Sequence, residues 1–193
     1  MILPVSMISL AILSAVSNKK ISRSGIISEF KEIRDTFSRD FVYQDMILET
    51  EKAIDYVLSY LSSEKIIKAN KKDISFDENG AEVLKFFAGM ILDYIESYMI
   101  VLNAVIDLSV NQIPRNDLVV EIRKTGTKMY HLSVIQCSES LSMINYNNTL
   151  DKLIETGILQ QTGDPRKAYI TVADRGKASV LKNVISTYIL KIQ

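Results

Sequence analysis

Residues 81–108, AEVLKFFAGMILDYIESYMIVLNAVIDL, decide the fold. Their apolar side chains recur at helical spacing and lie almost all round the predicted helix, which is typical of a helix in the middle of a bundle. Two carboxylates, Asp93 and Glu96, interrupt this apolar surface. Since a buried carboxylate must be paired or neutralised, we expect each of them to have a partner or to lie at an edge.

Helical periodicity continues on both sides of this stretch. Short polar segments at 62–80 and 157–173 separate the helices, and each contains two brief β-prone pieces around a turn, which favours a small hairpin. The fold class is therefore mainly α: a helical bundle of six to seven helices with one or two small β-hairpins. The expected helices lie within residues 1–18, 26–37, 44–61, 81–108, 117–132, 142–156 and 174–190.

The chain length of 193 residues fits a single helical module, residues 1–193. The formal net charge is zero, but its distribution is uneven. Residues 1–113 carry 16 acidic and 12 basic side chains, whereas residues 114–193 carry 7 acidic and 11 basic ones. We therefore expect an acidic sub-part, 1–113, and a basic sub-part, 114–193.

Composition excludes several classes of site. The only cysteine, Cys137, excludes a disulfide scaffold and a cysteine-based zinc cluster, and the only histidine, His131, excludes a multi-histidine metal site. Gln136, not an acid, stands five positions after His131. The sequence also has no glycine-rich phosphate loop and no Gly-x-Ser-x-Gly elbow. It therefore assigns no catalytic, cofactor-binding or metal-binding residue.

The first 18 residues carry no charge and include four serines. They lack the basic segment of a signal peptide and fall short of the roughly 20 strongly apolar residues that a bilayer span needs. They predict a buried helix. Asp93 and Glu96 disfavour a membrane span in residues 83–106, because charges are expensive in hydrocarbon.

The order of elements predicted for residues 114–193 is helix, helix, strand, turn, strand and helix, which resembles a winged helix. Residues 169–176, YITVADRG, resemble the wing-to-helix junction of bacterial regulators. The alternative function is thus a winged-helix DNA-binding transcriptional regulator. Its recognition helix would be 142–156, with Asn145, Asn147 and Asn148 reading bases. That helix has a net charge of −1, which disfavours a nucleic acid as partner.

Nearly the whole chain resembles the C-terminal region of the glycerol-3-phosphate and dihydroxyacetone-phosphate acyltransferase family. The resemblance rests on packing patterns rather than on chemical motifs. These are 2–13 (ILPVSMISLAIL), 26–41 with its Arg39-Asp40-Phe41, Leu84-Lys85-Phe86-Phe87, Ile95-Glu96-Ser97-Tyr98, Cys137-Ser138-Glu139-Ser140-Leu141-Ser142, Asn147-Asn148-Thr149-Leu150 and Glu155-Thr156-Gly157-Ile158-Leu159.

The resemblance implies membrane-associated enzymes of glycerophospholipid synthesis that transfer an acyl group from acyl-CoA to glycerol 3-phosphate. In that family a His and an Asp in a His-x4-Asp motif supply the base and its orienter, and this sequence lacks the motif. We therefore expect a non-catalytic region that packs on an acyltransferase catalytic domain, in the same longer chain or a separate one. The resemblance implies a location at the mitochondrial outer membrane or the endoplasmic reticulum.

Two further expectations concern surfaces. The chain is expected to be either the rear fragment of a longer enzyme or a short protein that keeps the helical region as a scaffold or regulatory piece. The uncharged first helix favours the fragment, because a preceding domain would normally cover its hydrophobic faces. In the basic sub-part, cationic side chains are expected to face anionic headgroups at a membrane surface. The candidate contact residues are Arg115, Arg123, Lys124 and Lys128.

Overall fold

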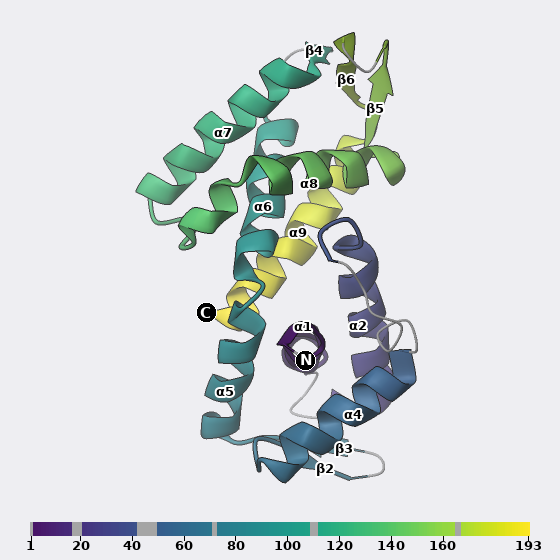
Figure 1. The fold of residues 1–193 in the computed structure, drawn as a ribbon, viewed down its shortest axis with the longest axis vertical. Coiled ribbons are helices and arrows are strands. Elements are labelled where there is room, and N and C mark those ends of the chain that lie inside the picture. The colour runs from purple at the N-terminus through teal and green to yellow at the C-terminus, as the bar shows by residue number, and fades with distance from the viewer. Residues whose placement is uncertain (1, 17–20, 42–49, 71–72, 109–111, 165–166) are drawn as a thin grey trace. The chain divides into compact units, whose positions relative to one another are not determined.

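The computed structural model describes residues 2–16, 21–41, 50–70, 73–108, 112–164 and 167–193 (Figure 1). Within these ranges the fold is mainly α, as predicted, with eight α-helices and two small three-stranded antiparallel sheets. The prediction of six to seven helices is close to this number. The chain forms two compact units, Met1–Leu92 with Tyr188–Gln193, and Asp93–Thr187. The sub-part boundary expected at residues 113/114 lies inside the second unit.

The first unit is built around α1 (Ile2–Ser14). Figure 1 shows α1 end-on among α2 (Arg23–Thr36), α4 (Thr50–Ser63) and α5 (Glu78–Gly89), and it packs against all three. The side chains of Met7, Ile8, Leu10 and Ile12 have no exposed surface. The buried helix predicted for this stretch is confirmed. Helices of this same chain cover α1, so its burial needs no preceding domain.

The hairpin predicted within 62–80 is part of a three-stranded sheet of order β1-β3-β2. It pairs β2 (Lys68–Ala69) with β3 (Asp73–Ser75), and β1 (Ile21–Ser22) adds the third strand. Caps position the helices that follow. The Ser22 hydroxyl accepts a hydrogen bond from the Gly25 N–H, and the Asp77 carboxylate accepts one from the Gly80 N–H.

The single helix predicted for 81–108 is wrong, because the chain breaks it at Met90 and Ile91. The structure has α5 and then α6 (Leu92–Ile106). At the break the Met90 and Ile91 N–H groups bond to the carbonyls of Phe87 and Ala88, which are three residues back rather than four. This tightening is typical of a helix end.

The second unit has the strand and helix order of a winged helix. After α6 come β4 (Ile113–Pro114), α7 (Arg115–His131), the 3₁₀ turn η1 (Ser138–Leu141), α8 (Met143–Glu155), β5 (Leu159–Thr162), β6 (Tyr169–Val172) and α9 (Arg175–Ile192). The sheet has the order β4-β6-β5. The predicted helix–helix–strand–strand–helix order is present, and β4 adds a strand that the sequence did not predict. The Arg175 guanidinium donates to the Ile106 and Leu108 carbonyls and so caps the end of α6.

Several expected boundaries agree with the structure. Ser142 caps α8, and Gly157 follows its end with a φ of +73°, which suits glycine. The predicted caps of α7 are wrong: Pro114, not Asn116 or Asp117, precedes its first turn. Part of the predicted helix 44–61 lies outside the described residues.

No single helix in the described ranges is long and apolar enough to cross a membrane. The consecutive helices Glu78–Gly89 and Leu92–Ile106 pass that length and composition test only as a pair.

Gly126 provides the first prediction. A Cβ at this position of α7 would lie 2.6 Å from the Tyr146 hydroxyl and 2.9 Å from Leu141 Cδ2. Gly126→Ala should therefore cost about 1–3 kcal/mol of unfolding free energy through overpacking. The matched control is Gly89→Ala, whose Cβ meets only Ile192 Cγ2 at an ordinary 3.7 Å. Thermal unfolding followed by circular dichroism compares the two, and equal melting temperatures would contradict the close α7–α8 packing.

Candidate functional site

One exposed face of α7 carries most of the predicted contact residues. Residues three and four apart lie on the same side of a helix, so they form a continuous stripe. This stripe lines a shallow hollow of about 430 Å³. We call it the basic stripe, and its members are Val120, Arg123, Lys124, Thr127, Lys128 and His131.

The structure brings together three of the four predicted contact residues, Arg123, Lys124 and Lys128, but not Arg115. The Arg115 guanidinium lies at the start of α7, 2.7 Å from the Asp151 carboxylate and 3.0 Å from the Gln161 side-chain oxygen. Its side chain is only 20% exposed. Arg115 therefore joins α7 to α8 and β5, and its charge is already paired.

The basic stripe carries more positive charge than its neighbours neutralise. Lys124 pairs with Glu121 at 2.6 Å, and both side chains are largely exposed, so this pair is weak. Within the described parts of the chain, Arg123 and Lys128 have no carboxylate within salt-bridge distance. The hollow therefore suits an anion better than a cation.

His131 does not have the surroundings of a general base. It is exposed at the end of α7, and its ring lies 6.3 Å from that of Tyr130. No acidic side chain lines the hollow beside it. A catalytic histidine needs a partner that fixes its orientation and tautomer. Among the described residues, no group of three or more His, Cys, Asp or Glu side chains converges as metal ligands would.

A second polar cluster surrounds the buried carboxylate of Glu96 on α6, which has no exposed surface. One carboxylate oxygen accepts a hydrogen bond from the Gln136 N–H at 2.7 Å. The other accepts from the Cys137 N–H at 2.9 Å and from the Ser140 hydroxyl at 2.6 Å. The expectation that Glu96 needs partners is confirmed, and the partners are backbone amides and a hydroxyl rather than a cation.

The neighbouring Ser97 extends this cluster to α8. Its hydroxyl oxygen lies 2.9 Å from the Ser140 carbonyl and accepts a hydrogen bond from the Asn145 side-chain amide at 3.2 Å. We call Glu96, Ser97, Ser140 and Asn145 the α6 clamp. It joins segments 95–98 and 137–142, which lie far apart in the sequence and carry two of the packing patterns of the family resemblance. The sequence signal for it was a Glu-Ser pair in an apolar helix and a serine-rich turn.

The carboxylate and hydroxyl groups of the α6 clamp all take part in hydrogen bonds within the fold. All hydrogen bonds of the Glu96 carboxylate serve the chain between α7 and α8. Burial and the nearby carboxylates of Glu96, Asp93 and Glu139 raise the pKa of Cys137 to about 11, so its thiol stays protonated at neutral pH. Burial also raises the pKa of Asp93. These residues support a structural role for the cluster.

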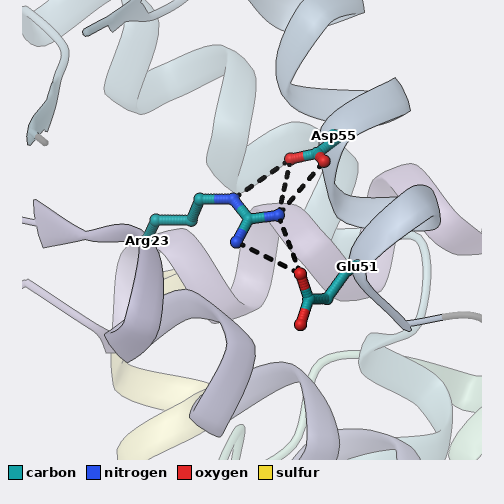
Figure 2. Close-up of polar contacts among 3 residues, drawn as sticks. All are labelled: Arg23, Glu51 and Asp55. Carbon is teal, nitrogen blue, oxygen red and sulfur yellow. Dashed lines mark hydrogen bonds and ion pairs between the residues drawn. The ribbon is translucent and has the colours of Figure 1, made fainter. Parts of the chain in front are cut away.

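The third polar cluster lies in the first unit (Figure 2). The Arg23 guanidinium donates to Asp55 at 2.9 Å and to Glu51 at 3.4 Å, and these bonds raise the pKa of Arg23. An open hollow of about 480 Å³ lies beside them, lined also by Ser59 and Asn70. Of the two carboxylates, only Asp55 lines the hollow, and it already pairs with the Arg23 guanidinium there, so the hollow does not suit a phosphate. Its bonds link the start of α2 to α4.

The α6 clamp generates the second prediction. In Glu96→Gln, one of the two oxygens that accept N–H and O–H bonds becomes an N–H donor facing other donors. The loss of charge-assisted hydrogen bonds should cost about 1.5–3 kcal/mol. Glu139→Gln is the control, because Glu139 is exposed and its carboxylate accepts a hydrogen bond from the neighbouring Ser138 hydroxyl at the surface. Chemical denaturation of both variants tests this, and a Glu96→Gln protein as stable as the control would refute the clamp.

Cys137 supplies the third prediction. With a pKa near 11, its thiolate fraction at pH 8 is roughly 100- to 200-fold below that of an ordinary cysteine. Alkylation of the folded protein by iodoacetamide should be slower by this factor than alkylation of the urea-unfolded chain, and should rise steeply above pH 10. As this is the only cysteine, mass spectrometry reads the rate directly. Equal rates in the folded and unfolded chains at pH 8 would contradict the assigned environment.

Comparison of the sequence with known proteins identifies a family for this chain. Residues 1–162 match the glycerol-3-phosphate acyltransferase C-terminal region. The chain is also similar to dihydroxyacetone phosphate acyltransferase from Homo sapiens (23% identical) and from Bos taurus (21% identical), over 139 residues in each case. That match covers 72% of this chain but only 20% of each relative, so the chain spans about a fifth of their length. The resemblance seen in the sequence is confirmed: the chain belongs to the family of the glycerol-3-phosphate acyltransferase C-terminal region.

Proposed function

We propose that this chain is the non-catalytic helical region of a glycerol-3-phosphate acyltransferase-like protein and packs on a catalytic domain that performs the acyl transfer. The observation that carries the proposal is the state of the α6 clamp. Its buried carboxylate, Glu96, is fully engaged in holding the chain, and no acidic side chain among the described residues lines the hollow that the lone histidine, His131, faces. The family match adds that the chain corresponds to a C-terminal region of glycerol-3-phosphate acyltransferase.

The first unit offers a face for the catalytic domain. Phe86 lies in the last turn of α5 and Met90 caps the end of that helix, and they are 66% and 41% exposed. The Phe86 ring makes an edge contact with Phe87, with ring centroids 5.8 Å apart. Exposed aromatic side chains that are supported from behind are typical anchors of protein interfaces. We therefore assign the Phe86–Met90 turn to the contact with the catalytic domain.

The proposal also includes a membrane surface. The basic stripe would contact anionic headgroups through Arg123, Lys124 and Lys128, each of which would contribute about 1 kcal/mol. The acyltransferase resemblance supports a location at the mitochondrial outer membrane or the endoplasmic reticulum. Arg115 takes no part, because Asp151 already neutralises it.

The winged-helix order of the second unit is the observation on which DNA binding rests, but the surface of α8 argues against it. Of the proposed base readers, Asn145 bonds to Ser97, and Asn147 bonds to the Met143 carbonyl and Arg115. The first exposed residues of α8 are Met143 and Ile144, which are apolar. This surface lacks the cations that hold phosphates.

The fourth prediction concerns activity and packing. The isolated chain, mixed with acyl-CoA and either glycerol 3-phosphate or dihydroxyacetone phosphate, should release no more free CoA than a protein-free control. In source cells, cross-linking at Lys85, next to Phe86, should join the chain to a polypeptide segment that contains a His-x4-Asp motif. Turnover by the isolated chain would overturn the non-catalytic assignment. Cross-links that reach only proteins without that motif would overturn the packing.

A further inference from the structure

Five large apolar side chains are exposed at one end of the second unit. They lie where α7 ends and where α8 begins, and between 38% and 73% of each is exposed. The start of α8 lies beside α7, since Leu141 and Tyr146 approach Gly126 (Figure 1). We call this set the apolar rim, and its members are Tyr130, Leu132, Val134, Met143 and Ile144.

Hydrogen bonds hold the apolar rim in place. The Leu132 N–H bonds to the Lys128 carbonyl, and the Val134 N–H bonds to the Met129 carbonyl at 2.9 Å. Beyond the rim, Ile135 is buried, and the next two N–H groups bond to Glu96 of the α6 clamp. The backbone of the rim is thus tied at both ends. Its apolar side chains are presented to solvent by a fixed scaffold, and such a patch marks an interaction site.

The basic stripe ends where the apolar rim begins. Lys128 lies one turn before Leu132, and Arg123 lies further back along the same helix. No acidic side chain lines the stripe's hollow. Cations beside exposed aliphatic and tyrosine side chains are the pattern of a surface that binds the interface of an anionic bilayer. The cations meet the phosphates while the apolar groups enter the headgroup region.

We propose that the apolar rim inserts into the interface of an anionic phospholipid membrane while the basic stripe binds its headgroups. This inference rests on the membrane contact of the proposed function and adds insertion to it. The rim and the stripe contribute separately, so each can be removed without the other. Leu132, Ile144, Arg123 and Lys128 are all exposed, so substitutions there leave the core and the α6 clamp intact.

The first experiment measures insertion. The chain contains no tryptophan, so Leu132→Trp and Ile144→Trp each provide a single reporter. With vesicles of phosphatidylcholine and phosphatidylserine, both should show a blue-shifted emission and lose quenching by aqueous iodide. Val180→Trp is the control, because Val180 is equally exposed on α9, away from the rim in sequence. The same emission with and without vesicles for the two rim reporters would overturn insertion.

The second experiment separates insertion from charge. Vesicle flotation compares the wild-type chain with Leu132→Ser/Ile144→Ser and with Arg123→Glu/Lys128→Glu. Each pair of substitutions should weaken vesicle binding at least tenfold. Only Arg123→Glu/Lys128→Glu should also lower the salt dependence of vesicle binding. Controls are Val180→Ser/Leu190→Ser for the rim and Lys177→Glu/Lys182→Glu for the stripe.

Each outcome decides one part of the account. If only the charge pair weakens vesicle binding, insertion is wrong and the headgroup contact of the proposed function stands. If neither pair does, or if the wild-type chain does not float, both are wrong. If the rim pair instead abolishes the cross-link to the His-x4-Asp segment and leaves flotation unchanged, the rim is a protein interface.

Discussion

The second unit depends on one buried negative charge. The Glu96 carboxylate has no exposed surface, and an unpaired charge in that position would be far too costly to bury. Two backbone N–H groups and the Ser140 hydroxyl satisfy it, so the chain between α7 and α8 must return to α6 at Gln136 and Cys137. That return sets where α8 starts and keeps the backbone before Ile135 on the outside. The apolar rim is exposed as a consequence.

The same constraint occupies the polar groups around Glu96 with structural hydrogen bonds. A buried carboxylate beside a cysteine and serines resembles a reactive site in composition alone. Here the carboxylate accepts only structural hydrogen bonds, and burial raises the pKa of Cys137 to about 11. The function that we propose therefore uses the exposed surface, where the basic stripe on α7 presents charge and the Phe86–Met90 turn at the end of α5 presents apolar side chains. This division agrees with membership of a family defined on the C-terminal region of acyltransferases.

Much of the fold could be predicted from local sequence signals, because periodicity, caps and glycines act over a few residues. The buried α1, the Ser142 cap and the positive φ of Gly157 are examples. The predictions that failed concern features that depend on contacts between residues far apart in the sequence. The helix breaks at Met90 although the apolar sequence pattern continues through this position. The two-residue strand β4 is recognisable as a strand only through its pairing with β6. For the site, the net positive charge of residues 114–193 pointed to four cations, three of which lie on the basic stripe. Nothing local in the sequence shows that Asp151 neutralises Arg115, or which groups satisfy Glu96.

The most direct test of the α6 clamp is hydrogen exchange of the Gln136 and Cys137 amides, followed by NMR on the wild-type chain. Both residues lie in an irregular segment just before η1, where amides without partners exchange at nearly the rate of an unfolded chain. Because the Glu96 carboxylate accepts both N–H groups, the account predicts slow exchange, comparable with that of amides within α6. Exchange at the unprotected rate would contradict it.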